Sequence, residues 1–166
     1  ETSRPFFKPP VYHLPTPLTM SEEIYQAIPH RPPFLFLDEI LEVTDTGARA
    51  SRTIRAEEPQ FEGHYPGNPI MPGVLLCEAV FQAGAVFLAR KQGVTAVGRT
   101  DLNPVLARIR DAKFKSMVKP GDELVIEAEH TETLGQFHFM KGRITRDDKP
   151  VMTVTFSLAM VEKEPA

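Results

Sequence analysis

The chain has a single cysteine, Cys77, among its 166 residues, and it carries no excess of positive charge. One cysteine cannot form a disulfide within the chain, and no Cys/His spacing typical of a zinc site occurs. The formal net charge is −3, whereas nucleic-acid-binding domains usually carry a strong basic excess. These absences favour a reducing, cytoplasmic compartment and argue against a metal site and a nucleic-acid partner.

The sequence also lacks an uninterrupted apolar run of the roughly 18 residues that a membrane-spanning helix needs. The nearest candidate, residues 74–89, contains Glu78 and Gln82, so no membrane span is expected. Apolar residues make up 42% and charged residues 25% of the chain. These proportions are typical of a globular protein rather than a disordered one.

Proline is concentrated at the start of the chain, where five of the 16 prolines lie within residues 1–19. Such a segment is not expected to form a regular element, so we predict a Pro-rich N-terminal arm or a cloning remnant there. Residues 20–166 are predicted to form a single domain. Within it, Ser21 and the acidic pair that follows predict a short helix that Pro29 ends.

One long helix and several antiparallel strands account for the rest of the chain. Residues 73–91 are apolar on nearly every side of a helix, which predicts that this helix is buried. Turn residues separate six strand-like runs, of which the second is polar and predicted to be exposed. These runs are residues 34–43, 48–56, 105–118, 123–132, 136–145 and 151–160. An antiparallel sheet wrapped around one central helix is the hotdog fold, an α+β architecture. Because a single curled sheet leaves one side of the helix open, dimerisation is expected.

Two polar side chains stand out against apolar surroundings. His64 lies in the Gly/Pro-rich segment 57–71, predicted to be a loop without regular structure, and Glu78 lies on the apolar helix. Burial favours the protonated form of a carboxyl group, which suits a general acid, and a neutral imidazole suits a general base. Gln82 shares the helix face of Glu78, and the free backbone N–H of Gly73 at the helix start could polarise a carbonyl oxygen. Together these groups suit removal of a proton next to a carbonyl and loss of a β-hydroxyl group.

Each of these residues also has a purely structural interpretation. A single histidine in a Gly/Pro loop is more often a surface or capping residue. A lone Glu or Gln in an apolar helix can serve as a structural hydrogen-bond partner. Tyr65 is expected to be a packing or gating side chain, Cys77 a core residue, and His30 a residue that orders a turn.

Three segments carry a resemblance to a known enzyme family: PHRPPFLFLDEILEV, FEGHYPGNPIMPGVLLCEAVFQAG and PVLARIRDAKFKSMVKPGDEL. In this order the chain resembles the FabZ type of (3R)-hydroxyacyl-acyl carrier protein dehydratase, from about residue 20 to residue 160. The resemblance implies the hotdog fold and dehydration of (3R)-hydroxyacyl-acyl carrier protein to the trans-2-enoyl product in fatty acid biosynthesis. It implies no metal and no organic cofactor. The related FabA type carries Asp where Glu78 stands, which favours a dehydratase without isomerase activity.

The resemblance also assigns roles to individual residues. It makes His64 the catalytic base and Glu78 the acid that handles the leaving water. The Gly73 amide would hold the thioester carbonyl, and Gln82 would orient the carboxyl group. Tyr65 belongs to the same predicted substrate-binding set. The resemblance further implies homodimers, with the His and Glu of one site on different subunits, and hexamers built as trimers of dimers.

The mechanism implies two further surfaces. Phe34, Phe61 and Phe81 are expected to line an apolar tunnel for the acyl chain. Acyl carrier protein is acidic, and a basic cluster is predicted to dock it. The cluster consists of Arg108, Arg110, Lys113, Lys115 and Lys119.

Rival functions remain open from the sequence. A hotdog thioesterase also places an acidic residue on the helix but hydrolyses the thioester. A non-catalytic hotdog subunit only binds acyl chains or partners. A dehydratase of a specialised polyketide-like pathway would use the same residues. The loop over residues 94–103 resembles the region that covers the acyl tunnel, and it leaves the preferred chain length open.

Overall fold

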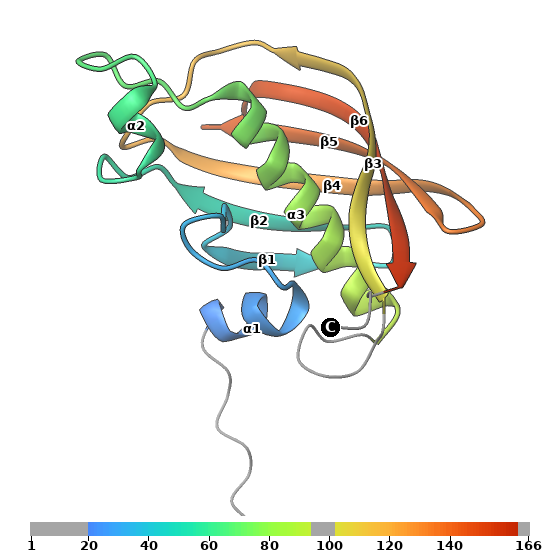
Figure 1. Ribbon diagram of the computed structural model, residues 1–166. Coiled ribbons are helices and arrows are strands. Elements are labelled where there is room, and N and C mark those ends of the chain that lie inside the picture. Colours follow the sequence, from blue (N-terminus) through green and yellow to red (C-terminus); the bar gives the residue numbers. More distant parts are fainter. Residues whose placement is uncertain (1–19, 94–101, 163–166) are drawn as a thin grey trace, which may run out of the picture.

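The computed structural model describes residues 20–93 and 102–162, so the predicted arm at residues 1–19 lies outside the described residues. Six antiparallel strands form one sheet in the order β1-β2-β4-β5-β6-β3. The elements are α1 (Met20–Ala27), β1 (Glu39–Val43), β2 (Gly47–Thr53), α2 (Gln60–Gly63), α3 (Gly73–Lys91), β3 (Leu102–Phe114), β4 (Glu123–Leu134), β5 (Phe137–Arg146) and β6 (Lys149–Glu162). The sheet curves around α3 (Figure 1), which confirms the predicted hotdog arrangement.

The long helix α3 is the core of the protein. Its residues from Leu76 to Ala89 are all buried except Glu78. By length and composition alone α3 is apolar enough to cross a membrane, but 72% of that stretch is buried inside the protein. The sheet supplies this burial, and the prediction of a core helix is confirmed.

A row of small residues lets α3 approach the sheet closely. Ala48, Ala128, Gly142 and Val154 are paired in register across β2, β4, β5 and β6. A Cβ atom added at Gly142 would lie 2.1 Å from Cγ1 of Val80 on α3. The helix therefore packs on this row without room for a larger side chain.

Three local expectations from the sequence are wrong. The second strand is not exposed: Ala48, Ala50 and Arg52 are buried in β2, because its small side chains face α3. The segment 57–71 is not entirely irregular, because a single helical turn, α2, follows Pro59. The first strand begins at Glu39 rather than residue 34, since backbone groups of residues 34 and 36 bond to a helix side chain instead of another strand.

Strand β3 forms an open edge of the sheet, because it pairs with β6 on one side only. Four of its apolar side chains are exposed to between 38% and 51%, namely Val105, Leu106, Ile109 and Phe114. An unpaired strand edge that carries apolar side chains is a site at which another chain can pair.

Candidate active site

The backbone around His64 fixes the orientation of its imidazole ring. The backbone N–H of His64 donates to the carbonyl oxygen of Gln60 at 3.0 Å and so closes α2. Nδ1 lies 2.7 Å from the carbonyl oxygen of Ile70. Because a carbonyl oxygen only accepts, Nδ1 must carry the proton, and in the neutral ring Nε2 is left as an unprotonated base. Sequence alone could not tell which ring nitrogen is unprotonated in the neutral ring.

Tyr65 packs against the His64 ring in an edge-on arrangement, with ring centroids 4.7 Å apart and an interplanar angle of 79°. Its backbone adopts a left-handed conformation, with φ of 56°, that non-glycine residues seldom adopt. The side chain is 61% exposed. This placement next to His64 is compatible with the predicted gating role, which stays a prediction.

Gly73 begins α3 directly after Pro72. A first-turn amide has no partner within its own helix, and in the described part of the chain no other group accepts from Gly73 N–H. A Cβ atom added at this position would lie 2.9 Å from the ring of Phe114. The glycine therefore lets the aromatic ring of β3 lie against the helix start, beside the predicted oxyanion donor.

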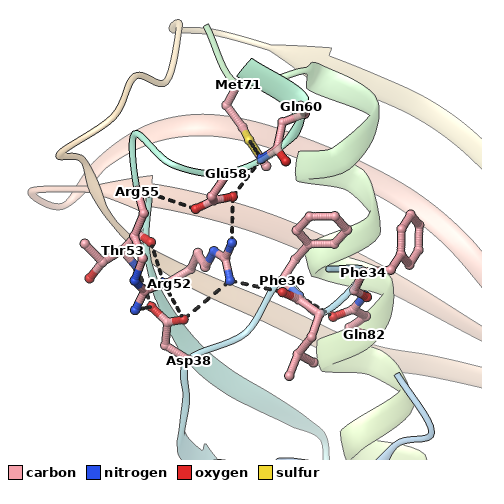
Figure 2. Close-up of polar contacts among 11 residues, drawn as sticks. Phe34, Phe36, Asp38, Arg52, Thr53, Arg55, Glu58, Gln60, Met71 and Gln82 are labelled. Carbon is pink, nitrogen blue, oxygen red and sulfur yellow. Dashed lines mark hydrogen bonds and ion pairs between the residues drawn. The ribbon is translucent and has the colours of Figure 1, made fainter. Parts of the chain in front are cut away.

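Gln82 holds Glu78 and ties α3 to the segment before β1. Its amide nitrogen donates to Glu78 Oε1 at 3.1 Å and to the carbonyl oxygen of Phe34 at 3.0 Å. Its amide oxygen accepts from the backbone N–H of Phe36 at 2.8 Å. Gln82 is completely buried, and the side chain of Glu78 is 19% exposed. The predicted pair on one helix face is therefore present, and the amide makes three hydrogen bonds (Figure 2 draws those to residues 34 and 36).

His30 also contacts Glu78, and sequence reasoning missed this contact. Its Nε2 lies 3.4 Å from Glu78 Oε1, and its Nδ1 is buried with no hydrogen-bond partner among the described residues. The residue was expected only to order a turn. The two positions are 48 residues apart, so no helical or strand periodicity links them.

Within one protomer, His64 and Glu78 do not meet. Among the described residues, no hydrogen bond or ion pair joins the two side chains. His64 contacts Tyr65 and Ile70, and Glu78 contacts Gln82 and His30. In the described part of the protomer, the two predicted catalytic side chains therefore belong to separate sets of contacts.

The other predicted site residues differ in their surroundings. Phe61 and Phe81 are buried, whereas Phe34 is 50% exposed. Burial raises the pKa of the Cys77 thiol, in agreement with a core residue that does not react. The predicted docking residues on and after β3 are all exposed. In the described residues, no group of three or more His, Cys, Asp or Glu side chains could hold a metal ion.

Comparison with known proteins places the chain in a family. Residues 28–155, most of the chain, match the family model of the FabA-like domain. The chain belongs to the FabA-like family. The match includes His30, His64, Glu78 and Gln82 and extends into β6.

Several curated FabA-like relatives are named 3-hydroxyacyl-[acyl-carrier-protein] dehydratase FabZ. The chain is 41% identical over 127 residues to that of Clostridium perfringens (strain SM101 / Type A), covering 76% of this chain and 88% of the relative. It is 47% identical over 110 residues to that of Caldicellulosiruptor bescii, with coverages of 65% and 74%. For Symbiobacterium thermophilum the identity is 40% over 146 residues, with coverages of 85% and 99%. The predicted FabZ type is thereby confirmed.

Solved structures share the fold of this FabA-like chain at lower identity. A chain of the dehydratase heterocomplex ApeI:P from Xenorhabdus doucetiae superposes with a TM-score of 0.70 at 17% identity, covering 84% of this chain and 91% of that chain. A hypothetical thioesterase from Streptococcus pneumoniae TIGR4, solved with coenzyme A, superposes with a TM-score of 0.54 at 19% identity, with coverages of 76% and 88%. Proteins named as dehydratases and as thioesterases thus share this fold, so the fold alone does not distinguish the two activities.

Proposed function

We propose that this protein removes water from (3R)-hydroxyacyl-acyl carrier protein and forms the trans-2-enoyl product in fatty acid biosynthesis. The observation that carries the proposal is the carboxyl group of Glu78, held on an apolar helix by the fully buried Gln82. The FabZ relatives, with identities of 40–47%, are named for this activity. The protein is proposed to act in the cytoplasm.

The proposed reaction is a reversible syn elimination. Nε2 of His64 takes the C2 proton, and the electron pair of that C–H bond forms the C2–C3 double bond. Glu78 protonates the C3 hydroxyl group, which leaves as water as the C3–O bond breaks. Each acid–base group contributes on the order of 10²–10⁴ in rate. The Gly73 N–H would stabilise the developing charge on the thioester oxygen, which contributes on the order of 10²–10³. The thioester itself acidifies the C2 proton, so the proposal requires no metal and no organic cofactor.

The active assembly is proposed to be a homodimer in which each site takes His64 from one subunit and Glu78 from the other. In the described part of one protomer the two side chains contact different partners and not each other, which agrees with this arrangement. The open apolar edge of β3 supports pairing between two chains. Three such dimers would form the proposed hexamer.

A short enoyl thioester separates the proposed activity from thioester hydrolysis. Because the elimination is reversible, the purified protein should hydrate crotonyl thioester to 3-hydroxybutyryl thioester without releasing free thiol. The ultraviolet absorbance of the enoyl group follows hydration, and a thiol reagent follows hydrolysis. Release of thiol at the rate of enoyl loss would assign the protein to the thioesterases, and no reaction of either kind would favour a binding subunit. Assays across acyl lengths would test a specialised pathway.

The predicted docking cluster gives an expected result of its own. Reversing the charge of Arg108 and Arg110 together should raise the KM for carrier-linked substrate by about tenfold, because electrostatic steering of this kind is worth 10-fold or more. The KM for a short thioester mimic should not change. Lys149→Glu, an exposed reversal elsewhere on the sheet, is the matched control. Equal effects of the double reversal on both substrates would remove the docking assignment.

The contact between His30 and Glu78 predicts a role in the reaction. His30→Asn should lower kcat about tenfold with little change in KM, because it removes the ring nitrogen that lies 3.4 Å from Glu78 Oε1 and helps to place that carboxyl group. His30→Gln should keep most of the activity, since its amide nitrogen can reach the place of Nε2. Steady-state kinetics on both variants checks this. Asn and Gln variants with the same kcat as the parent would contradict it.

A further inference from the structure

A buried ion pair joins Arg52 to Glu58 (Figure 2), at the start of the loop that carries His64. Nη2 of Arg52, on β2, lies 2.7 Å from Oε2 of Glu58, at the start of the loop, and their side chains are only 10% and 9% exposed. Nε of Arg52 is buried with no hydrogen-bond partner among the described residues. Taking two charges out of water is costly, and such pairs seldom add net stability. A gain in stability therefore does not explain why Arg52 and Glu58 are buried together.

The carboxylate of Glu58 bonds directly at the start of the loop and reaches its end through Gln60. It accepts from the backbone N–H of Arg55 at 2.8 Å, before the loop, and from the side-chain amide of Gln60 at 2.6 Å, in α2. The same Gln60 nitrogen lies 3.3 Å from Sδ of Met71, where the loop ends. The Gln60 carbonyl oxygen in turn accepts from the backbone N–H of His64. Glu58 and Gln60 thus connect the two loop ends between which His64 is placed.

Arg52 fixes that carboxylate to the rest of the protein. Its Nη1 donates to the carbonyl oxygen of Leu35 at 3.0 Å and lies 3.4 Å from Asp38 Oδ1. The guanidinium group also lies over the ring of Phe36, at 5.7 Å from its centroid. Arg52 therefore cannot shift without moving the segment before β1, and it presents a rigid partner to Glu58.

We propose that Glu58 is a positioning residue for the catalytic base: held by Arg52, its carboxylate fixes the loop of residues 57–71 and thereby the place of His64 in the site. The proposal rests on the proposed dehydratase function. It assigns Glu58 to the base side of the reaction, not to the acid side. A shift of about 1 Å in a reacting group can cost on the order of 10² in rate.

The first test compares two neutralised carboxylates. Glu58→Gln should lower kcat at least about tenfold with KM changed by no more than about twofold. Glu57→Gln, an exposed neighbour with the same chemical change, should behave like the parent. In case Glu58→Gln unfolds, Arg52→Met combined with Glu58→Met replaces the ion pair by apolar side chains, a change that folds often tolerate. It should show at least the same loss of kcat in a folded protein, with a lower Tm because the Leu35 carbonyl oxygen loses its partner.

The second test places Glu58→Gln on one side of a mixed dimer. A chain with Glu78→Gln supplies His64, and a chain with His64→Ala supplies Glu78. Adding Glu58→Gln to the chain that supplies His64 should lower the restored activity by the factor seen in the homodimer. Adding it to the chain that supplies Glu78 should leave the activity unchanged.

The outcomes separate this inference from the proposed function. An unmodified protein that dehydrates no hydroxyacyl thioester contradicts the function. An active protein in which Glu58→Gln matches Glu57→Gln overturns the inference alone. Equal losses with Glu58→Gln on either chain of the mixed dimer also overturn it, because a general effect on the fold would then explain the loss. If mixing restores no activity, the comparison of Glu58→Gln with Glu57→Gln in homodimers decides whether Glu58 positions His64.

Discussion

His64→Ala and Glu78→Gln should each abolish nearly all turnover while leaving the fold intact. Loss of one acid–base group is expected to cost on the order of 10²–10⁴ in kcat. Neither side chain belongs to the apolar core, since both are only partly buried. The Tm of each variant should therefore stay within a few degrees of the parent. Glu78→Gln keeps the volume and a hydrogen-bond acceptor for Gln82, so it removes the proposed acid and little else.

Mixing the two inactive variants tests whether the site spans two subunits. After complete exchange, half of the dimers are mixed and each holds one intact site, so about a quarter of the parental activity should return. Each variant incubated alone through the same exchange procedure is the control. Full activity in either single variant would contradict the assigned roles. No recovery on mixing, with exchange confirmed by mass spectrometry, would contradict a site shared between chains.

Gln82→Leu should damage both stability and activity. The substitution leaves the Phe36 N–H and the Phe34 carbonyl oxygen without their partner, in a position that is completely buried. Each buried group left unpaired costs about 1–3 kcal/mol, so the free energy of unfolding should fall by about 2–6 kcal/mol. Loss of the donor to Glu78 should also lower kcat, by about tenfold.

Denaturant unfolding and steady-state kinetics check these two effects separately. Gln92→Leu makes the same chemical change at an exposed position just after α3 and should alter neither quantity. A Gln82→Leu protein as stable as the parent would show that water or a rearranged backbone satisfies the segment before β1. A stable variant with unchanged kcat would remove Gln82 from the site.

Periodic patterns in the sequence predicted the elements that bury their side chains regularly. The all-round apolar character of residues 73–91 predicted a core helix, and α3 spans the same residues. The four-residue spacing of Glu78 and Gln82 predicted that they share a face, and they are hydrogen-bonded. Such predictions succeed because helix geometry fixes which neighbours can meet.

Contacts between elements far apart in the chain could not be predicted in this way. The contact of His30 with Glu78 and the pairing of Arg52 with Glu58 depend on how the chain folds back on itself, not on spacing. The burial of β2 was missed because its alanines and Arg52 read as polar or weakly apolar. Their burial follows from the position of β2 between β1 and β4 and against α3, which only the folded arrangement reveals.

The close packing of α3 on Gly142 limits how the substrate preference can be changed. Val80, which touches that glycine, lies half a turn from Glu78 on the same helix. A bulkier residue at 142 would push against Val80 and would tilt the turn that carries Glu78, the proposed acid. Substitutions meant to make room for longer acyl chains should therefore leave the face of α3 that packs on the sheet unchanged. They should instead be made on the face of α3 that points away from Gly142.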